Sequence, residues 1–131
     1  MRIALTILLI ALGSFSQQVA AENEVDCQEN QLSANMCASF SAAKADELLN
    51  ERYQQLYEQL TKSSNKKRLL AAQRAWLKFR DANCLYEAQG SSEEGGSKFP
   101  MEYDQCVERL TMQRAAKIEE FLECTVNGCP E

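Results

Sequence analysis

The stretch 73–84 holds the residues best suited to chemistry, because a side-chain amide, a cation and a thiol lie there at spacings that place them on one face of a helix. One stripe of a helix would contain Gln73, Trp76, Leu77, Arg80 and Cys84. A stripe that faces a core tolerates Arg80 only where a counter-charge and further hydrogen-bond partners meet it. Such an arginine could join helices through an ion pair, or it could bind a small anion or carboxylate.

Polar residues in other parts of the chain could meet this arginine. Asp46 is the natural counter-charge for Arg80 or for Arg114, a second arginine that falls in an apolar stripe. The expected polar network consists of Asp46, Asn50, Gln73, Arg80, Thr111 and Arg114, with Trp76 as the core anchor. We favour a structural role, in which the network sets the register of a helix bundle. The alternative is a site that holds a small anionic ligand at the two arginines.

Catalytic machinery has little support in the sequence. The chain contains no histidine, so the most frequent general base and metal ligand is missing. It has no Cys-x-x-Cys pair and no Gly-x-Ser-x-Gly motif. Adjacent acids such as Glu93 and Glu94 are typical of solvated surfaces. We therefore expect a non-enzymatic protein with no cofactor and no metal.

The N-terminal segment 1–21 has the features of a signal peptide. Arg2 precedes a short, almost unbroken apolar run, and small residues at 19–21 precede the expected cleavage near Ala21. The apolar run is shorter than the roughly 20 residues of a membrane-spanning helix. We expect a periplasmic or secreted protein with no stable membrane insertion, formed by a single domain at residues 22–131.

The net negative charge indicates which kinds of molecule are plausible binding partners. The formal charge of −5 becomes −6 when Arg2 leaves with the signal segment, which contains no acid. Nucleic acid is therefore a poor partner candidate, and so is anionic lipid. A cationic protein would be attracted over a long range.

Apolar residues recur with the period of helices, and no strand-like alternation is visible. The pattern predicts an all-α fold, a small antiparallel bundle whose three main helices lie at about residues 36–61, 66–87 and 101–123. The predicted inward stripe of the first helix is Met36, Phe40, Leu49, Tyr53, Leu56 and Leu60. Residues 89–100 are rich in glycine and serine and are expected to form a loop. Its acids, Glu93 and Glu94, are the candidate partner contacts.

The mature chain would keep six cysteines, which in an exported protein favours three structural disulfides. Antiparallel packing of consecutive helices would gather four of them at one end of the bundle. The simplest pairing is Cys84–Cys106, Cys124–Cys129 and Cys27–Cys37. The spacing leaves open a second pairing of the four, Cys37–Cys84 with Cys27–Cys106.

A longer set of motifs runs through the chain. Gln-x-x-Trp-x-x-x-Arg-Asp-x-x-Cys ends at Cys84, Gly-Gly-Ser follows at 95–97, and Cys106 precedes Thr-x-x-Arg, which ends at Arg114. Across about residues 27–124 this set resembles the LprI-type lysozyme-inhibitor domain family, and within it the small YecT-type secreted proteins. The resemblance implies a helical, disulfide-bonded envelope protein. It does not imply membrane attachment, because no lipid-anchor cysteine follows the expected cleavage site.

Resemblance and charge together give two expectations for function. The first is a non-enzymatic, lysozyme-inhibitor-like binder that acts by protein–protein contact, with a cationic protein such as lysozyme as its partner. The alternative is a small envelope binding module or stress factor that holds an anionic ligand at the Arg/Asp cluster.

Overall fold

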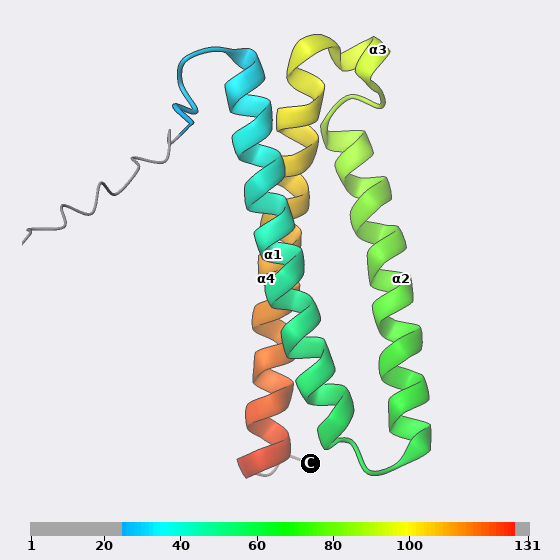
Figure 1. Ribbon diagram of the computed structural model, residues 1–131. Coiled ribbons are helices and arrows are strands. Elements are labelled where there is room, and N and C mark those ends of the chain that lie inside the picture. Colours follow the sequence, from blue (N-terminus) through cyan, green and yellow to red (C-terminus); the bar gives the residue numbers. More distant parts are fainter. Residues whose placement is uncertain (1–24, 128–131) are drawn as a thin grey trace, which may run out of the picture.

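A computed structural model describes residues 25–127, which form three long helices (Figure 1). These are α1 (Gln31–Gln59), α2 (Ser63–Glu87) and α4 (Phe99–Asn127). Between α2 and α4 lie the short helix α3 (Ser92–Gly95) and the 3-10 turn η1 (Gly96–Lys98). No strand occurs in this part of the chain, and the predicted all-α bundle of three main helices is confirmed. The predicted signal peptide, 1–21, lies outside the described residues.

The long helices are not equally packed. Helices α1 and α4 lie side by side and run in the same direction, and α2 runs antiparallel to both (Figure 1). Most interhelical contacts join α1 to α4, whereas α2 meets α4 along a smaller interface and stands apart from α1. The pair α1–α4 is therefore the base of the fold, and α2 is attached to it.

Small residues form the face of α1 that packs on α4. Ala38, Ala42 and Ala45 are buried. The predicted inward stripe was wrong at its N-terminal end, because Met36 and Phe40 are 53% and 66% exposed. The distance between two helix axes depends on the side chains at their contact. Alanines allow a close approach that methionine and phenylalanine would block, so the larger residues turn outward.

Two apolar clusters fill the interior. The first consists of Leu49, Leu56, Ala115, Ile118 and Leu122, with Leu48, Leu69 and Trp76 packed against it. The second consists of Ala42, Cys84, Cys106 and Val107, with Tyr103 and Leu110 packed against it. Helix α2 contributes little to either cluster, since its buried residues are Gln73 and Cys84. Apolar packing therefore holds α2 less firmly than it holds α1 and α4 together, and other interactions must add to it.

Helix α1 starts earlier than the predicted residue 36 because a capping box lies upstream. The Asn30 side chain accepts a hydrogen bond from the backbone N–H of Ser33 at 3.0 Å. The Ser33 hydroxyl in turn accepts from the Asn30 N–H at 3.0 Å. The two residues satisfy each other's free groups and fix the helix start at Gln31.

The expected loop at 89–100 is partly helical, which corrects that prediction. It holds α3 and η1, and its last two residues already belong to α4. Pro100 is tolerated there because the first turn of a helix needs no backbone N–H donor. Gly90 and Gly96 have φ of 93° and 63°, values that favour glycine, and they bracket α3. The segment is therefore a shaped connection between α2 and α4.

Two of the predicted disulfides are confirmed: Cys27–Cys37 and Cys84–Cys106. The first ties the N-terminal segment to α1, and the second ties the end of α2 to α4. The alternative pairing of these four cysteines is thereby excluded. The third predicted bridge includes Cys129, which lies outside the described residues.

Candidate functional site

Arg80 joins all three long helices. Its Nη1 donates to Asp46 Oδ1 of α1 at 2.7 Å and to Thr111 Oγ1 of α4 at 3.2 Å. Its Nε donates to the carboxylate of Asp81, the next residue of α2, at 2.9 Å. The Arg80 side chain is 11% exposed and Thr111 is fully buried. Two carboxylates and a hydroxyl thus compensate a guanidinium that is largely removed from water.

A second pair continues the network toward the lower end of the bundle. Arg114 Nε of α4 donates to Gln73 Oε1 of α2 at 3.1 Å. Burial lowers the pKa of Arg114 below its ordinary value. Both arginines lie near the Trp76 ring, whose centroid is 5.4 Å from Arg80 Cζ and 5.8 Å from Arg114 Cζ. Trp76 also packs against the first apolar cluster, so it joins the polar network to the core.

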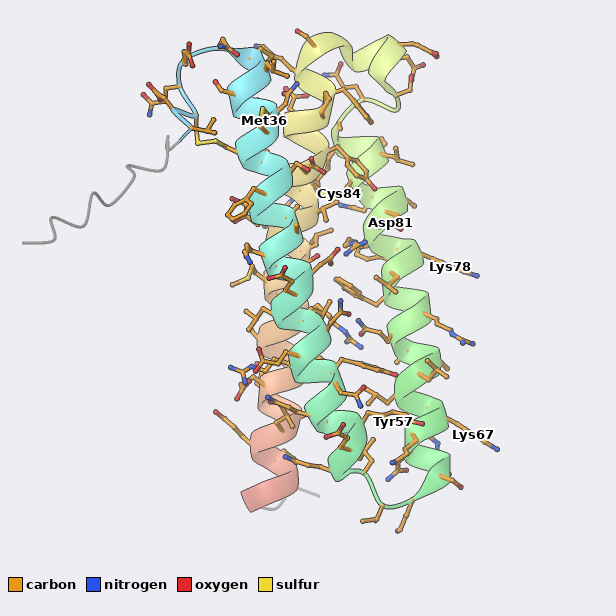
Figure 2. All side chains as sticks on the ribbon, in the orientation of Figure 1. Met36, Tyr57, Lys67, Lys78, Asp81 and Cys84 are labelled. Carbon is orange, nitrogen blue, oxygen red and sulfur yellow. A yellow bond between two sulfur atoms is a disulfide. The ribbon has the colours of Figure 1, made fainter. Side chains whose placement is uncertain are left out.

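The structure brings five of the sequence-predicted network residues together: Asp46, Gln73, Arg80, Thr111 and Arg114. Asn50 is exposed on α1, and its side chain forms no hydrogen bond with any of residues 25–127. Asp81 was missed by the sequence reasoning because adjacent residues do not normally share a helix face. Lys78, on the same helix, points away from α1 and α4 (Figure 2). We interpret the network as the device that fixes the register of α2 against α1 and α4.

A slot of about 380 Å³ lies between α1 and α2. Its lining is Asp46, Leu49, Asn50 and Tyr53 from α1, and Leu70, Gln73, Arg74 and Leu77 from α2. Side chains reach into the space between the two helices, with Tyr57 near its lower end (Figure 2). The volume lies in the range of small-molecule sites, and the lining mixes leucines with polar groups as such sites do. Sequence reasoning missed this slot because nothing in the sequence shows that α1 and α2 stand apart.

Acidic residues gather at the end of the bundle where α1 and α4 begin and α2 ends, at the top of Figure 1. We call this region, residues 25–36 and 85–109, the acidic end. Its carboxylates are Asp26, Glu29, Glu87, Glu93, Glu94, Glu102, Asp104 and Glu108, and its cations are Lys98 and Arg109. Arg109 is ion-paired with Glu87. The remaining acids therefore leave this end strongly negative.

The candidate contact residues Glu93 and Glu94 both lie on α3 in the acidic end and are exposed. Glu94 accepts a long hydrogen bond, 3.4 Å, from the Ser91 hydroxyl. Glu93 has no ion pair or hydrogen bond within the described range. Its carboxylate is therefore available to a partner.

One acid at this end is partly withdrawn from water. Burial raises the pKa of Asp104 above its ordinary 3.8, and a hydrogen bond with Ser39 of α1 offsets part of that rise. Asp104 lies where α4 packs on α1, so its ionised form is costly in the folded state.

Two further findings concern the described residues alone. They contain no cluster of three or more cysteine or acidic side chains arranged to hold a metal ion. None of their helices combines the length and the apolar character needed to cross a membrane.

The fold and the network define a class of small, disulfide-linked helical proteins in which charged side chains help to attach one helix to the others. The chain belongs to the LprI family: the family model described as "Lysozyme inhibitor LprI" matches residues 22–118. It is also 30% identical to an uncharacterised protein of Rhizobium meliloti (strain 1021), over 97% of this chain and 100% of the relative. A search of solved structures gave no significant match. The predicted family is thus confirmed, and the closer likeness to YecT-type proteins stays a prediction.

Proposed function

We propose that this protein is a non-enzymatic inhibitor of lysozyme that acts by protein–protein contact outside the cytoplasm. The observation that carries the proposal is the family match over residues 22–118, since the family model is described as a lysozyme inhibitor. The family also suggests a periplasmic or extracellular location. Two disulfides agree with such an oxidising compartment.

The acidic end is the proposed contact surface. A basic lysozyme would be drawn to a surface whose acids far outnumber its cations, which speeds encounter and orients the partner. Glu93 is the leading contact because its carboxylate is exposed and has no partner among the described side chains. The Cys84–Cys106 disulfide lies at the base of the segment that carries it and limits how far that segment can move.

The first test measures lysozyme activity in the presence of the exported, oxidised protein. We expect inhibition at micromolar excess in low salt, with clear weakening at higher salt because charged surfaces are screened. Unchanged lysozyme activity at that excess would refute the proposal.

A pair of charge variants then tests the surface. Glu93→Lys/Glu94→Lys reverses two carboxylates at the acidic end. Glu58→Lys/Glu123→Lys is the matched control, because both residues are exposed at the opposite end and the change in net charge is equal. We expect inhibition to weaken about tenfold or more in the first variant and at most slightly in the control. Equal weakening in both would show that net charge matters and this surface does not.

The alternative function, an anionic ligand at Arg80 and Arg114, gains no specific support. Arg80 directs its N–H groups at Asp46, Asp81 and Thr111, and Arg114 donates from its Nε to Gln73. An anion at Arg80 would have to displace two carboxylates that already pair with it.

A further inference from the structure

The slot between α1 and α2 contains a cation that the polar network does not use. Arg74 lines the slot from α2 and is exposed. Its guanidinium forms no ion pair or hydrogen bond with any side chain of residues 25–127, whereas Arg80 and Arg114 are both bonded. Arg74 is thus an arginine of the slot lining that remains free to take an anion.

Two further donors lie in the same lining. The Tyr53 hydroxyl is covered from solvent and has no hydrogen-bond partner within the described chain. Burial is the largest cause of a raised pKa for Tyr53, while Arg74 lowers that pKa through its charge. The hydroxyl therefore stays protonated at neutral pH and close enough to Arg74 to feel it. Asn50 adds an exposed amide whose N–H groups are not used by the described residues.

The rest of the lining is largely apolar. Leu49 is buried at the floor, Leu77 is half-buried, and Leu70 is 38% exposed. An alkyl chain laid along Leu70 and Leu77 would remove their apolar surface from water. The one carboxylate in the lining, Asp46, is ion-paired with Arg80 and so repels a second anion only weakly.

From this juxtaposition we propose that the slot binds an amphipathic monocarboxylate. The carboxylate would pair with Arg74, and the alkyl chain would lie against Leu70 and Leu77. The inference goes beyond the proposed function, because this site lies on the flank of the bundle and the proposed lysozyme contact lies at its acidic end.

The test is isothermal titration calorimetry of the oxidised protein with octanoate, kept below the concentration at which it aggregates. Acetate supplies the carboxylate without the chain, and octan-1-ol supplies the chain without the charge. We expect saturable binding of one octanoate, and at least tenfold weaker binding of either control compound. No lysozyme is present, so the result is independent of the proposed function.

Two matched variants assign the charge. Arg74→Gln should weaken octanoate binding about tenfold to a hundredfold, the range expected for losing a charge-assisted pair. Arg68→Gln makes the same charge change at an exposed arginine of α2 that is not part of the slot lining, and should bind octanoate within about twofold of the unaltered protein. The proposal is overturned if octanoate shows no saturable binding, if octan-1-ol binds equally well, or if the two variants behave alike.

Discussion

Replacing Arg80 with methionine tests whether the polar network holds α2 to the bundle. Methionine keeps an apolar stem but removes the charge and every N–H donor. Asp46 and Asp81 are 44% and 49% exposed, so both can return to water and their lost ion pairs count for about 1 kcal/mol or less. Thr111 is fully buried, and leaving its hydroxyl without the arginine donor costs about 1–3 kcal/mol.

The contact between the Arg80 guanidinium and the Trp76 ring adds about 0.5–1 kcal/mol. The variant should therefore lose about 2–4 kcal/mol of unfolding free energy, most of it from Thr111. That is a large share of the stability of a domain this small. Helix α2 should be the element most affected, since it has little apolar burial to replace the network.

Urea unfolding of the oxidised protein at pH 7, followed by its helical circular dichroism, measures the change. With a slope of about 2 kcal/mol per molar urea, the middle of the usual range, the midpoint should fall by about 1–2 M. The matched control is Lys78→Met, which removes a cation from the outward side of α2 (Figure 2) and should change stability by less than about 0.5 kcal/mol. Arg80→Met/Thr111→Val should recover part of the loss, because the orphaned hydroxyl is then absent.

An Arg80→Met variant that is no less stable than Lys78→Met would contradict this role of the polar network. That result would mean that the desolvation cost of burying Arg80 equals the stabilisation from its ion pairs and hydrogen bonds, as happens for some buried charges. A double variant no more stable than Arg80→Met would instead show that Thr111 is not the source of the loss.

Two further predictions concern the α1–α4 interface. The pKa of Asp104 is higher in the folded protein than in the unfolded chain, so the free energy of unfolding should fall as pH rises from the ordinary pKa near 3.8 through the raised one. Asp104→Asn should therefore be more stable than the unaltered protein at pH 7. A less stable variant at that pH would contradict the assignment. Ala45→Leu should lower the free energy of unfolding, measured in a urea titration, by about 1–3 kcal/mol because it forces α1 away from α4. Phe40→Gln should change it by less than about 0.5 kcal/mol. The reverse order would mean that the stripe predicted from the sequence, and not the alanine face, packs on α4.

The sequence is sufficient for the parts of the fold that depend on chain connectivity. Helical periodicity and short connections predict three helices, and these in turn place four cysteines at one end. The spacing alone left their pairing open. The preference for Cys27–Cys37 and Cys84–Cys106 was correct because each bridge joins residues that the chain already brings close.

The orientation of α1 could not be predicted in the same way. An apolar stripe through Met36 and Phe40 has the right period, and so does the stripe through Ala38, Ala42 and Ala45. Hydrophobicity favours the larger residues, yet the close contact with α4 selects the smaller ones. Which stripe faces α4 depends on the distance between the axes of α1 and α4. These two helices are far apart in the chain, so no local sequence pattern indicates that distance.

The position of Arg74 in the slot lining could not be predicted, for a related physical reason. Arg80 stood out because its position in an apolar stripe demands a counter-charge, whereas Arg74 lies beside that stripe and looks like an ordinary solvated cation. Arg74 lines the slot only because α1 and α2 stand apart in the folded protein.

The way α2 is attached connects the network to the slot. A helix held by wide apolar burial would be drawn close to both neighbours, and no space would remain beside it. Here α2 buries Gln73 and Cys84, and it is fixed instead by a disulfide to α4 and by the long side chain of Arg80. An arginine that must reach Asp46 across the interface sets a wider spacing between α1 and α2 than leucines would. The polar network therefore stabilises the bundle and, by the same geometry, keeps the slot open.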